Sequence, residues 1–223
     1  MKTRTKVVVM GGGRAGCSTL DHLTQESWTD VVLLERNDLT SGTTWHSAAQ
    51  VTNFGMNQTM VGLKTHSINL YKELADDPDY PINYNHGDGG IRLANTKEQM
   101  QGYHHFASMA RGMDVDFEVI DAKECHRRHP LISTNNLIGG LWDPLDGDID
   151  PYQLCHSLTR KARQAGAAVY TNTPVTALEQ YQDGTWKVTN ENGGIDCEVV
   201  GNACGCRVNE VGEMTGGCRQ VAS

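Results

Sequence analysis

The sequence predicts an α/β fold, in which a parallel sheet with helices on both faces is joined to part of a second, mainly antiparallel domain. Residues 6–10 (KVVVM) and 31–34 (VVLL) are short apolar runs, typical of strands buried on both faces. Between them lie a glycine-rich turn at residues 11–16 and apolar residues near helical spacing. Strand, turn, helix and strand in this order form one parallel βαβ unit.

The next part of the chain is predicted to alternate loops, helices and short strands. Residues 40–54 are rich in Gly, Ser, Thr and Ala, which indicates a loop. Residues 76–89 are turn-like, and residues 90–94 indicate a strand. A helix is expected between the loop and the turn, and the apolar residues close to one of its faces are Met60, Leu63, Leu70 and Leu74.

Two capping signals mark the helices that follow. Thr96 and Gln99 predict a capping box for a helix that ends near Met113. Asp121 is expected to cap a short helix, which Pro130 ends because proline cannot continue a helical hydrogen-bond ladder.

The last third of the chain combines a well-marked helix with several strands. Asp150 is the predicted N-cap, Pro151 occupies the first helical position and Gly166 ends the helix. Asn192 and Gly193 predict the turn of a hairpin. The strands expected here are residues 167–171, 175–179, 185–188 and 195–203.

Composition limits the class of protein. A net charge of -8 argues against nucleic acid as a partner, since phosphate binding needs a basic face. It still allows an anionic cofactor, because backbone amides at a helix N-terminus can bind a pyrophosphate. No stretch approaches the roughly 20 apolar residues of a membrane-spanning helix, so no membrane partner is expected. The odd, dispersed set of seven cysteines predicts reduced thiols and a cytoplasmic location.

The turn GGGRAG fits the dinucleotide-binding template GxGxxG through Gly11, Gly13 and Gly16. Gly11 permits the tight turn, Gly13 lets the backbone approach a pyrophosphate, and Gly16 lets helix and strand pack closely. Glu35 ends the second strand, where its carboxylate can accept from a ribose hydroxyl and would repel a 2′-phosphate, which makes NADP an unfavourable ligand. This pattern alone leaves FAD and NAD open.

The segment after Glu35, LTSGTTWHSAAQ, resembles the flavin-side loop of the dimethylglycine and sarcosine dehydrogenase family, within the D-amino-acid-oxidase-like group. The resemblance continues through NFGMNQTM, GDGGIRLA, HPLI, GGLWDPLDGDIDP and GNACGCRVNEVGEM, and so spans nearly the whole chain. It implies a Rossmann-like FAD-binding domain and favours FAD over NAD.

The resemblance also implies the cofactor-binding residues. The histidine of TWH matches His46 and implies a covalent bond to FAD; the alternative is an ordinary loop histidine. Val175 matches a position whose backbone faces the adenine, while Ala203 and Gly205 match a second cofactor loop; ordinary strand and turn remain the alternative. Some family members carry Trp-Ala where this chain has Arg207 and Val208, which leaves the fine contacts open. The full expected set is Gly11, Gly13, Gly16, Glu35, Arg36, Thr43, Thr44, His46, Val175, Ala203 and Gly205.

Other chemistry-bearing patterns do not fit a known site. Cys204 and Cys206 do not supply four zinc ligands, and neither does the cluster of Cys125, His126 and His129, so no metal is expected. No GxSxG nucleophile elbow is present, which argues against hydrolysis.

The family resemblance implies a discontinuous cofactor domain. Its first segment is expected at residues 1–55 and its second at 148–223, with a partial substrate domain at 56–147. The sequence stops where the family's sheet would continue, so we expect a truncated product with an open sheet edge. Residues that contact the substrate are expected beyond Ser223, and no catalytic acid or base is named.

The leading hypothesis is an FAD-dependent amine oxidoreductase that oxidises dimethylglycine or sarcosine. The resemblance implies hydride transfer from the N-methyl carbon to the flavin, with an electron-transfer flavoprotein or oxygen as the electron acceptor. It also leaves the mitochondrial matrix as an alternative location. A second hypothesis is a catalytically incompetent nucleotide-binding or regulatory fragment of the same family. A third, an NAD-dependent dehydrogenase, is disfavoured by the TWH loop.

Overall fold

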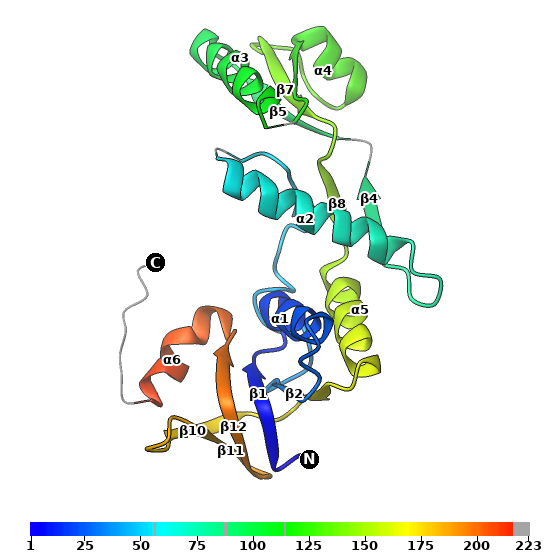
Figure 1. The fold of residues 1–223 in the computed structure, drawn as a ribbon. Helices are drawn as coiled ribbons and strands as arrows, with labels where there is room; N and C mark the ends of the chain where they lie inside the picture. The colour runs from blue at the N-terminus through cyan, green and yellow to red at the C-terminus, as the bar shows by residue number, and fades with distance from the viewer. Residues whose placement is uncertain (56, 87–88, 114, 216–223) are drawn as a thin grey trace. The chain divides into compact units, whose positions relative to one another are not determined.

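A computed structural model describes residues 1–55, 57–86, 89–113 and 115–215 of the chain (Figure 1). The structure divides into two compact units. Unit 1 comprises residues 1–48 and 150–223, and unit 2 comprises residues 49–149. Cys218 lies outside the described residues.

Unit 1 contains a six-stranded sheet in the order β10-β11-β12-β1-β2-β9. Strands β12, β1, β2 and β9 run parallel to one another, and β11 and β10 extend the sheet beyond β12 with antiparallel pairing. The predicted α/β class with a parallel sheet is therefore confirmed. The strands are β1 (Arg4–Met10), β2 (Val31–Leu34), β9 (Ala168–Tyr170), β10 (Val175–Gln180), β11 (Trp186–Asn190) and β12 (Gly193–Asn202).

Helices cover both faces of this sheet. Val8 and Met10 of β1 lie in a buried cluster with Val32 and Leu34 of β2, and Val211 of α6 (Val208–Glu213) packs on it. Because strand side chains alternate, the other residues of β1 point to the opposite face. There α1 (Arg14–Gln25) packs on β1 and β2, and α5 (Pro151–Gln164) packs on α1. A short 3-10 turn, η1 (Gly205–Arg207), precedes α6.

Unit 2 contains two small antiparallel sheets. The first has the order β3-β8-β4 and the second the order β5-β7-β6. Their strands are β3 (Gln50–Val51), β4 (Tyr84–His86), β5 (Gly90–Ala94), β6 (Glu118–Asp121), β7 (Gly139–Asp143) and β8 (Gly147–Ile149). The helices of the unit are α2 (Gln58–Ala75), α3 (Lys97–Arg111) and α4 (Ala122–Arg128).

The predicted helix caps are confirmed. Thr96 and Gln99 form both hydrogen bonds of a capping box at the start of α3. Asp121 and Asp150 accept hydrogen bonds from backbone amides in the first turns of α4 and α5. Gly166 has a φ of +107°, which lets the chain leave α5 in a conformation that favours glycine.

The predicted hairpin is also confirmed, with the turn shifted by one residue. Asn190 of β11 pairs with Gly193 of β12, so Glu191 and Asn192 form the turn. Gly193 is the first residue of β12 and has a φ of +127°.

The predicted buried face of α2 is wrong in part. Met60 is 43% and Leu63 is 59% exposed, Leu70 is half-buried, and only Leu74 of the expected set is fully covered. The helix instead buries Val61, which packs on the cluster around Phe106 and Phe117, together with Ile68. The helix has apolar residues on more than one side, so spacing alone could not tell which side faces the core.

Two further features of the chain follow from the described residues. Cys17, Cys125, Cys155, Cys197, Cys204 and Cys206 are free thiols. No helix in the described part is long and apolar enough to cross a membrane.

Replacement of Gly16 should destabilise the folded chain, whereas replacement of a solvent-facing glycine should not. A Cβ at Gly16 would lie 1.8 Å from the backbone oxygen of Gly11, whereas a Cβ at Gly62 in α2 would meet nothing within 4 Å. We expect Gly16→Ala to lower the free energy of unfolding by at least about 2 kcal/mol. Gly62→Ala should raise it by about 0.5–1 kcal/mol. Urea unfolding of both variants measures this, and equal stabilities would contradict the packing described.

Candidate dinucleotide site

The turn after β1 is built from close contacts between backbone atoms. Gly11 has a φ of +109°, and a Cβ there would lie 2.5 Å from the carbonyl oxygen of Ala203. The Gly11 amide donates to the carbonyl of Leu34, and the Ala203 amide donates to the carbonyl of Met10. The turn therefore lies where the ends of β1, β2 and β12 meet, and side chains at positions 11 and 16 would disrupt it.

The N-terminus of α1 faces this turn with amides that no helix residue uses. Gly13 is the N-cap and supplies no side-chain cap, and the first turn of this fully described helix carries no acidic side chain. The amide of Arg14 donates to Thr44 Oγ1 at 3.0 Å. A Cβ on Gly13 would lie 3.0 Å from the same oxygen. Bare backbone and first-turn amides of this kind suit an anionic group such as a pyrophosphate.

Glu35 follows β2 and lies against the glycine turn. Its Oε2 accepts from the Gly12 amide at 2.6 Å, and its Oε1 accepts from the Asn37 amide at 2.9 Å. The residue is half-buried, whereas the neighbouring Arg36 is exposed. Each carboxylate oxygen has a second lone pair, so Glu35 can also accept from a ribose hydroxyl.

The loop that carries His46 folds back onto the same turn. The Thr40 amide donates to the Gly12 carbonyl at 2.9 Å, and the Trp45 amide contacts the Thr40 carbonyl at 3.2 Å. His46 is exposed, and its Nδ1 lies 3.1 Å from the carbonyl of Gly42. The loop thus presents an imidazole to solvent, six residues after Thr40, which is bonded to the glycine turn.

The remaining expected residues are also in unit 1. Gly205 has a φ of +58°, and a Cβ there would lie 3.6 Å from Thr43 Oγ1. Val175 is partly buried at the start of β10 and packs on the same core cluster as β1 and β2. Nearby, the Thr173 amide donates to the Glu35 carbonyl at 2.8 Å. The structure therefore brings the three template glycines together with Glu35, Thr43, Thr44, Ala203 and Gly205.

Two thiols lie beneath the turn, a feature that the sequence motif did not indicate. Cys17 Sγ donates to the Gly12 carbonyl at 3.5 Å, and Cys204 Sγ donates to the Met10 carbonyl at 3.4 Å. A hydrogen bond with the Cys155 thiol, together with burial, raises the pKa of Cys17, while Cys17 lowers the pKa of Cys155. Burial raises the pKa of Cys204 to about 11. Neutral thiols at Cys17 and Cys204 add no negative charge beside an anion site.

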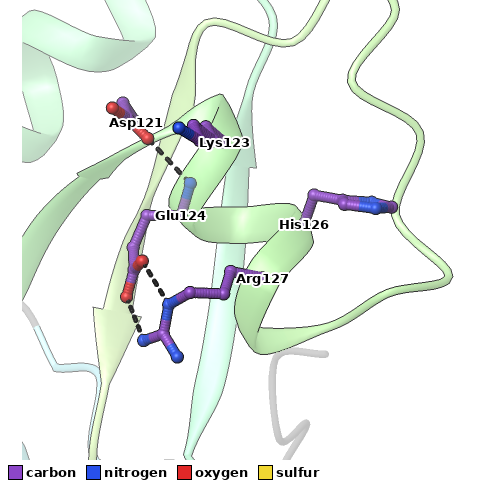
Figure 2. A pocket seen from close by; sticks show the side chains of 5 residues that line it. All are labelled: Asp121, Lys123, Glu124, His126 and Arg127. Atoms are coloured by element: carbon purple, nitrogen blue, oxygen red, sulfur yellow. Dashed lines mark hydrogen bonds and ion pairs between the residues drawn. The ribbon is translucent and has the colours of Figure 1, made fainter.

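A surface hollow on unit 2 contains several charged side chains but offers little to a ligand (Figure 2). Arg127 and Glu124 form two hydrogen bonds of 2.6 Å with each other. Hydrogen bonds from Arg127 and Arg128 lower the pKa of Glu124 to about 2. His126 Nδ1 lies 2.9 Å from the Ile132 carbonyl. Glu124, His126 and Arg127 therefore already have hydrogen-bond partners within the protein. The residues that line the hollow are Asp121, Lys123, Glu124, His126 and Arg127.

Within the ranges that the structure describes, no three His, Cys, Asp or Glu side chains gather in a way that could bind a metal ion.

Comparison with known proteins identifies the family. The family model of the FAD-dependent oxidoreductases (DAO) matches residues 6–221. The chain belongs to this family. The glycine turn, the first-turn amides of α1 and Glu35 fit the ADP part of FAD, because they leave room for a pyrophosphate and provide an acceptor for a ribose.

Relatives of known name cover nearly the whole chain. It is 34% identical over 215 residues to the mitochondrial dimethylglycine dehydrogenase of Rattus norvegicus, covering 96% of this chain and 25% of the relative. It is 32% identical over 222 residues to the mitochondrial sarcosine dehydrogenase of Homo sapiens, which covers 97% of this chain and 24% of that relative. The chain thus spans about a quarter of the length of these relatives.

A solved structure shares the fold. The L-proline dehydrogenase of P. horikoshii superimposes with a TM-score of 0.91 over 100% of this chain and 58% of the other, at 21% sequence identity. At this identity the similarity shows the fold alone, a mixed α/β architecture with a parallel sheet.

The carboxylate of Glu35 should contribute to binding of the ADP part of the cofactor. We expect Glu35→Gln to raise the Kd for ADP about tenfold, because a charge-assisted hydrogen bond to the ribose becomes a neutral one. Asp38→Asn is the matched control, since Asp38 is an exposed carboxylate that accepts from Asn172 at 3.3 Å. Calorimetric titration with ADP measures both, and an unchanged Kd for Glu35→Gln would contradict this role.

Proposed function

We propose that this chain holds the FAD of an amine oxidoreductase that oxidises an N-methylated glycine, dimethylglycine or sarcosine. The observation that carries the proposal is the sequence similarity to two dehydrogenases named for these substrates, which extends over nearly the whole chain. The nucleotide-fitting geometry of the glycine turn supports the same conclusion.

In this proposal the ADP part of FAD lies against the glycine turn. The amide of Gly13 and the N-terminus of α1 bind the pyrophosphate, and Glu35 accepts from the ribose. Val175, Ala203 and Gly205 line the same cofactor, as do Arg36, Thr43 and Thr44. When bound, FAD supplies the two-electron acceptor for the hydride of the N-methyl carbon. The protein positions the cofactor, and no residue of this chain is assigned as acid or base.

The covalent link to FAD is proposed at His46. The imidazole is exposed, and the neighbouring Thr44 hydroxyl accepts a hydrogen bond from the first turn of α1. This places the histidine on a loop fixed beside the proposed pyrophosphate site. A covalent bond there would fix the ring and prevent loss of the cofactor.

The wider assignments are part of the same proposal. Residues 1–55 and 148–223 are the two segments of the cofactor domain, and residues 56–147 are part of the substrate domain. The electron acceptor is an electron-transfer flavoprotein or oxygen. The mitochondrial names of both relatives favour the mitochondrial matrix over the cytoplasm as the location.

The covalent bond is tested by acid precipitation of flavin-loaded protein. We expect the flavin to remain in the pellet with the unaltered chain and to move to the supernatant with His46→Ala. His105→Ala, which removes an exposed histidine of α3, is the control and should behave like the unaltered chain. Flavin released from the unaltered chain, or retained by His46→Ala, would overturn the assignment.

The substrate class is tested by anaerobic reduction of the flavin. We expect dimethylglycine or sarcosine to bleach the flavin absorbance of the loaded chain, and glycine, the unmethylated control, to leave it unchanged. Bleaching by glycine alone would contradict the substrate class. No bleaching by any of the three amines would favour the catalytically incompetent fragment instead.

A further inference from the structure

Unit 2 contains a buried cluster of charged side chains that takes no part in the cofactor site. Two segments of the chain meet there. The cluster consists of Arg92 on β5, Asp143 at the end of β7 and Asp146 in the turn that follows. Gly90 of β5 pairs with Asp143, and a Cβ on Gly90 would lie 2.4 Å from Asp146 Oδ2. The glycine at position 90 therefore lets the aspartate turn pack directly on β5.

One cation lies against two carboxylates in this cluster. Arg92 Nη1 is 3.1 Å from Asp146 Oδ2 and 4.0 Å from Asp143 Oδ2. The side chain of Asp143 is 0% exposed and that of Asp146 is 14% exposed. Asp143 Oδ1 accepts from the Leu145 amide at 3.0 Å, but Oδ2 has no hydrogen-bond partner among the described residues.

With both aspartates ionised, the cluster would bury one uncompensated negative charge. Such a charge is expensive away from water, and a pair of neighbouring carboxylates avoids the cost by keeping one proton. We propose that Asp143 and Asp146 share one proton in the folded chain, so that the Arg92–Asp143–Asp146 cluster acts as a pH-sensitive lock within unit 2.

The surroundings of Asp143 agree with a bound proton. Burial, the hydrogen bond that a protonated Asp143 can donate to Asp146 and the charge of Asp146 raise the pKa of Asp143 from 3.8 to about 7, against the opposing effects of the Leu145 amide and Arg92. The buried hydroxyl of Tyr84 on β4 also faces the charge of Asp146. Burial is the largest effect on Tyr84 and raises its pKa, so Tyr84 stays neutral and does not compensate either carboxylate.

The cluster fixes the three residues that follow β3. Arg92 Nη2 donates to Thr52 Oγ1, and its guanidinium carbon lies 4.4 Å from the centre of the Phe54 ring. Asp146 Oδ1 accepts from the Asn53 amide at 3.1 Å. Ionisation of Asp143 would place a second full negative charge beside the Asp146 carboxylate that accepts from Asn53, and the two carboxylates would repel each other. The contacts within the cluster are therefore stronger when Asp143 carries its proton and weaker when it does not.

The direction of the pH dependence follows from the raised pKa. The folded chain binds a proton that the unfolded chain releases at lower pH, so the stabilisation is complete below about pH 4 and is lost as pH rises through about 7. Asp143→Asn keeps the shape of the side chain and abolishes its titration. Asp148→Asn is the matched control, because Asp148 is an exposed carboxylate on β8 that accepts from Asn85 at 3.0 Å.

The test is urea unfolding of the full chain from pH 5 to pH 8, with hydrogen exchange of the amides of Asn53 and Phe54 measured in parallel. Between pH 5 and pH 8 we expect the unaltered chain and Asp148→Asn to lose stability relative to Asp143→Asn, and the two amides to lose protection against exchange relative to the same variant. Parallel pH curves for the unaltered chain and Asp143→Asn would overturn the proposal.

A second measurement serves if Asp143→Asn does not fold. The infrared spectrum of the unaltered chain at pH 6 should contain the stretch of a protonated carboxylic acid, and this band should disappear at pH 8.5. Asp146→Asn should move that transition to lower pH, because it removes the like charge. A spectrum without the acid band at pH 6 would also overturn the proposal. Neither measurement depends on FAD.

Discussion

At Gly16, α1 approaches the preceding turn so closely that an added Cβ would lie 1.8 Å from the carbonyl oxygen of Gly11. This contact lets the helix begin next to the ends of β1, β2 and β12, where the Arg14 amide donates to Thr44 of the neighbouring loop. The rest of the site follows from it. Glu35 can reach the Gly12 amide, and the loop with His46 can fold back through Thr40. An acidic chain thereby obtains an anion site from backbone dipoles, without basic side chains.

The thiols next to this turn are uncharged. Cys17 and Cys204 donate their thiol hydrogens to backbone carbonyls beneath it, and burial helps to raise the pKa of both, so neither becomes a thiolate at neutral pH. Glu35 is a carboxylate beside the turn, and two backbone amides donate hydrogen bonds to it. In unit 2 the cation Arg92 faces two aspartates, Asp143 and Asp146. A proton shared by the two carboxyl groups compensates the extra negative charge. The two units thus solve the problem of buried charge in different ways.

Local rules predicted most of the first unit and less of the second. The apolar runs of β1 and β2, the glycine turn and the cap at Asp150 are each encoded within a few residues, so the sequence alone identified them. Strands β4 and β8 were missed, because YNH and GDI are short, polar segments that pair across more than sixty residues of sequence. Similarly, the contacts of Arg92 depend on β5 and β7 meeting in space, which no local pattern contains.

The most direct test of the account is the backbone amide NMR spectrum of the chain as FAD is added. If the dinucleotide binds at the glycine turn, the largest shift changes will fall on the amides of Gly13 and Arg14, which lie at the start of α1. Changes confined to unit 2, with these two signals unmoved, would contradict the central claim.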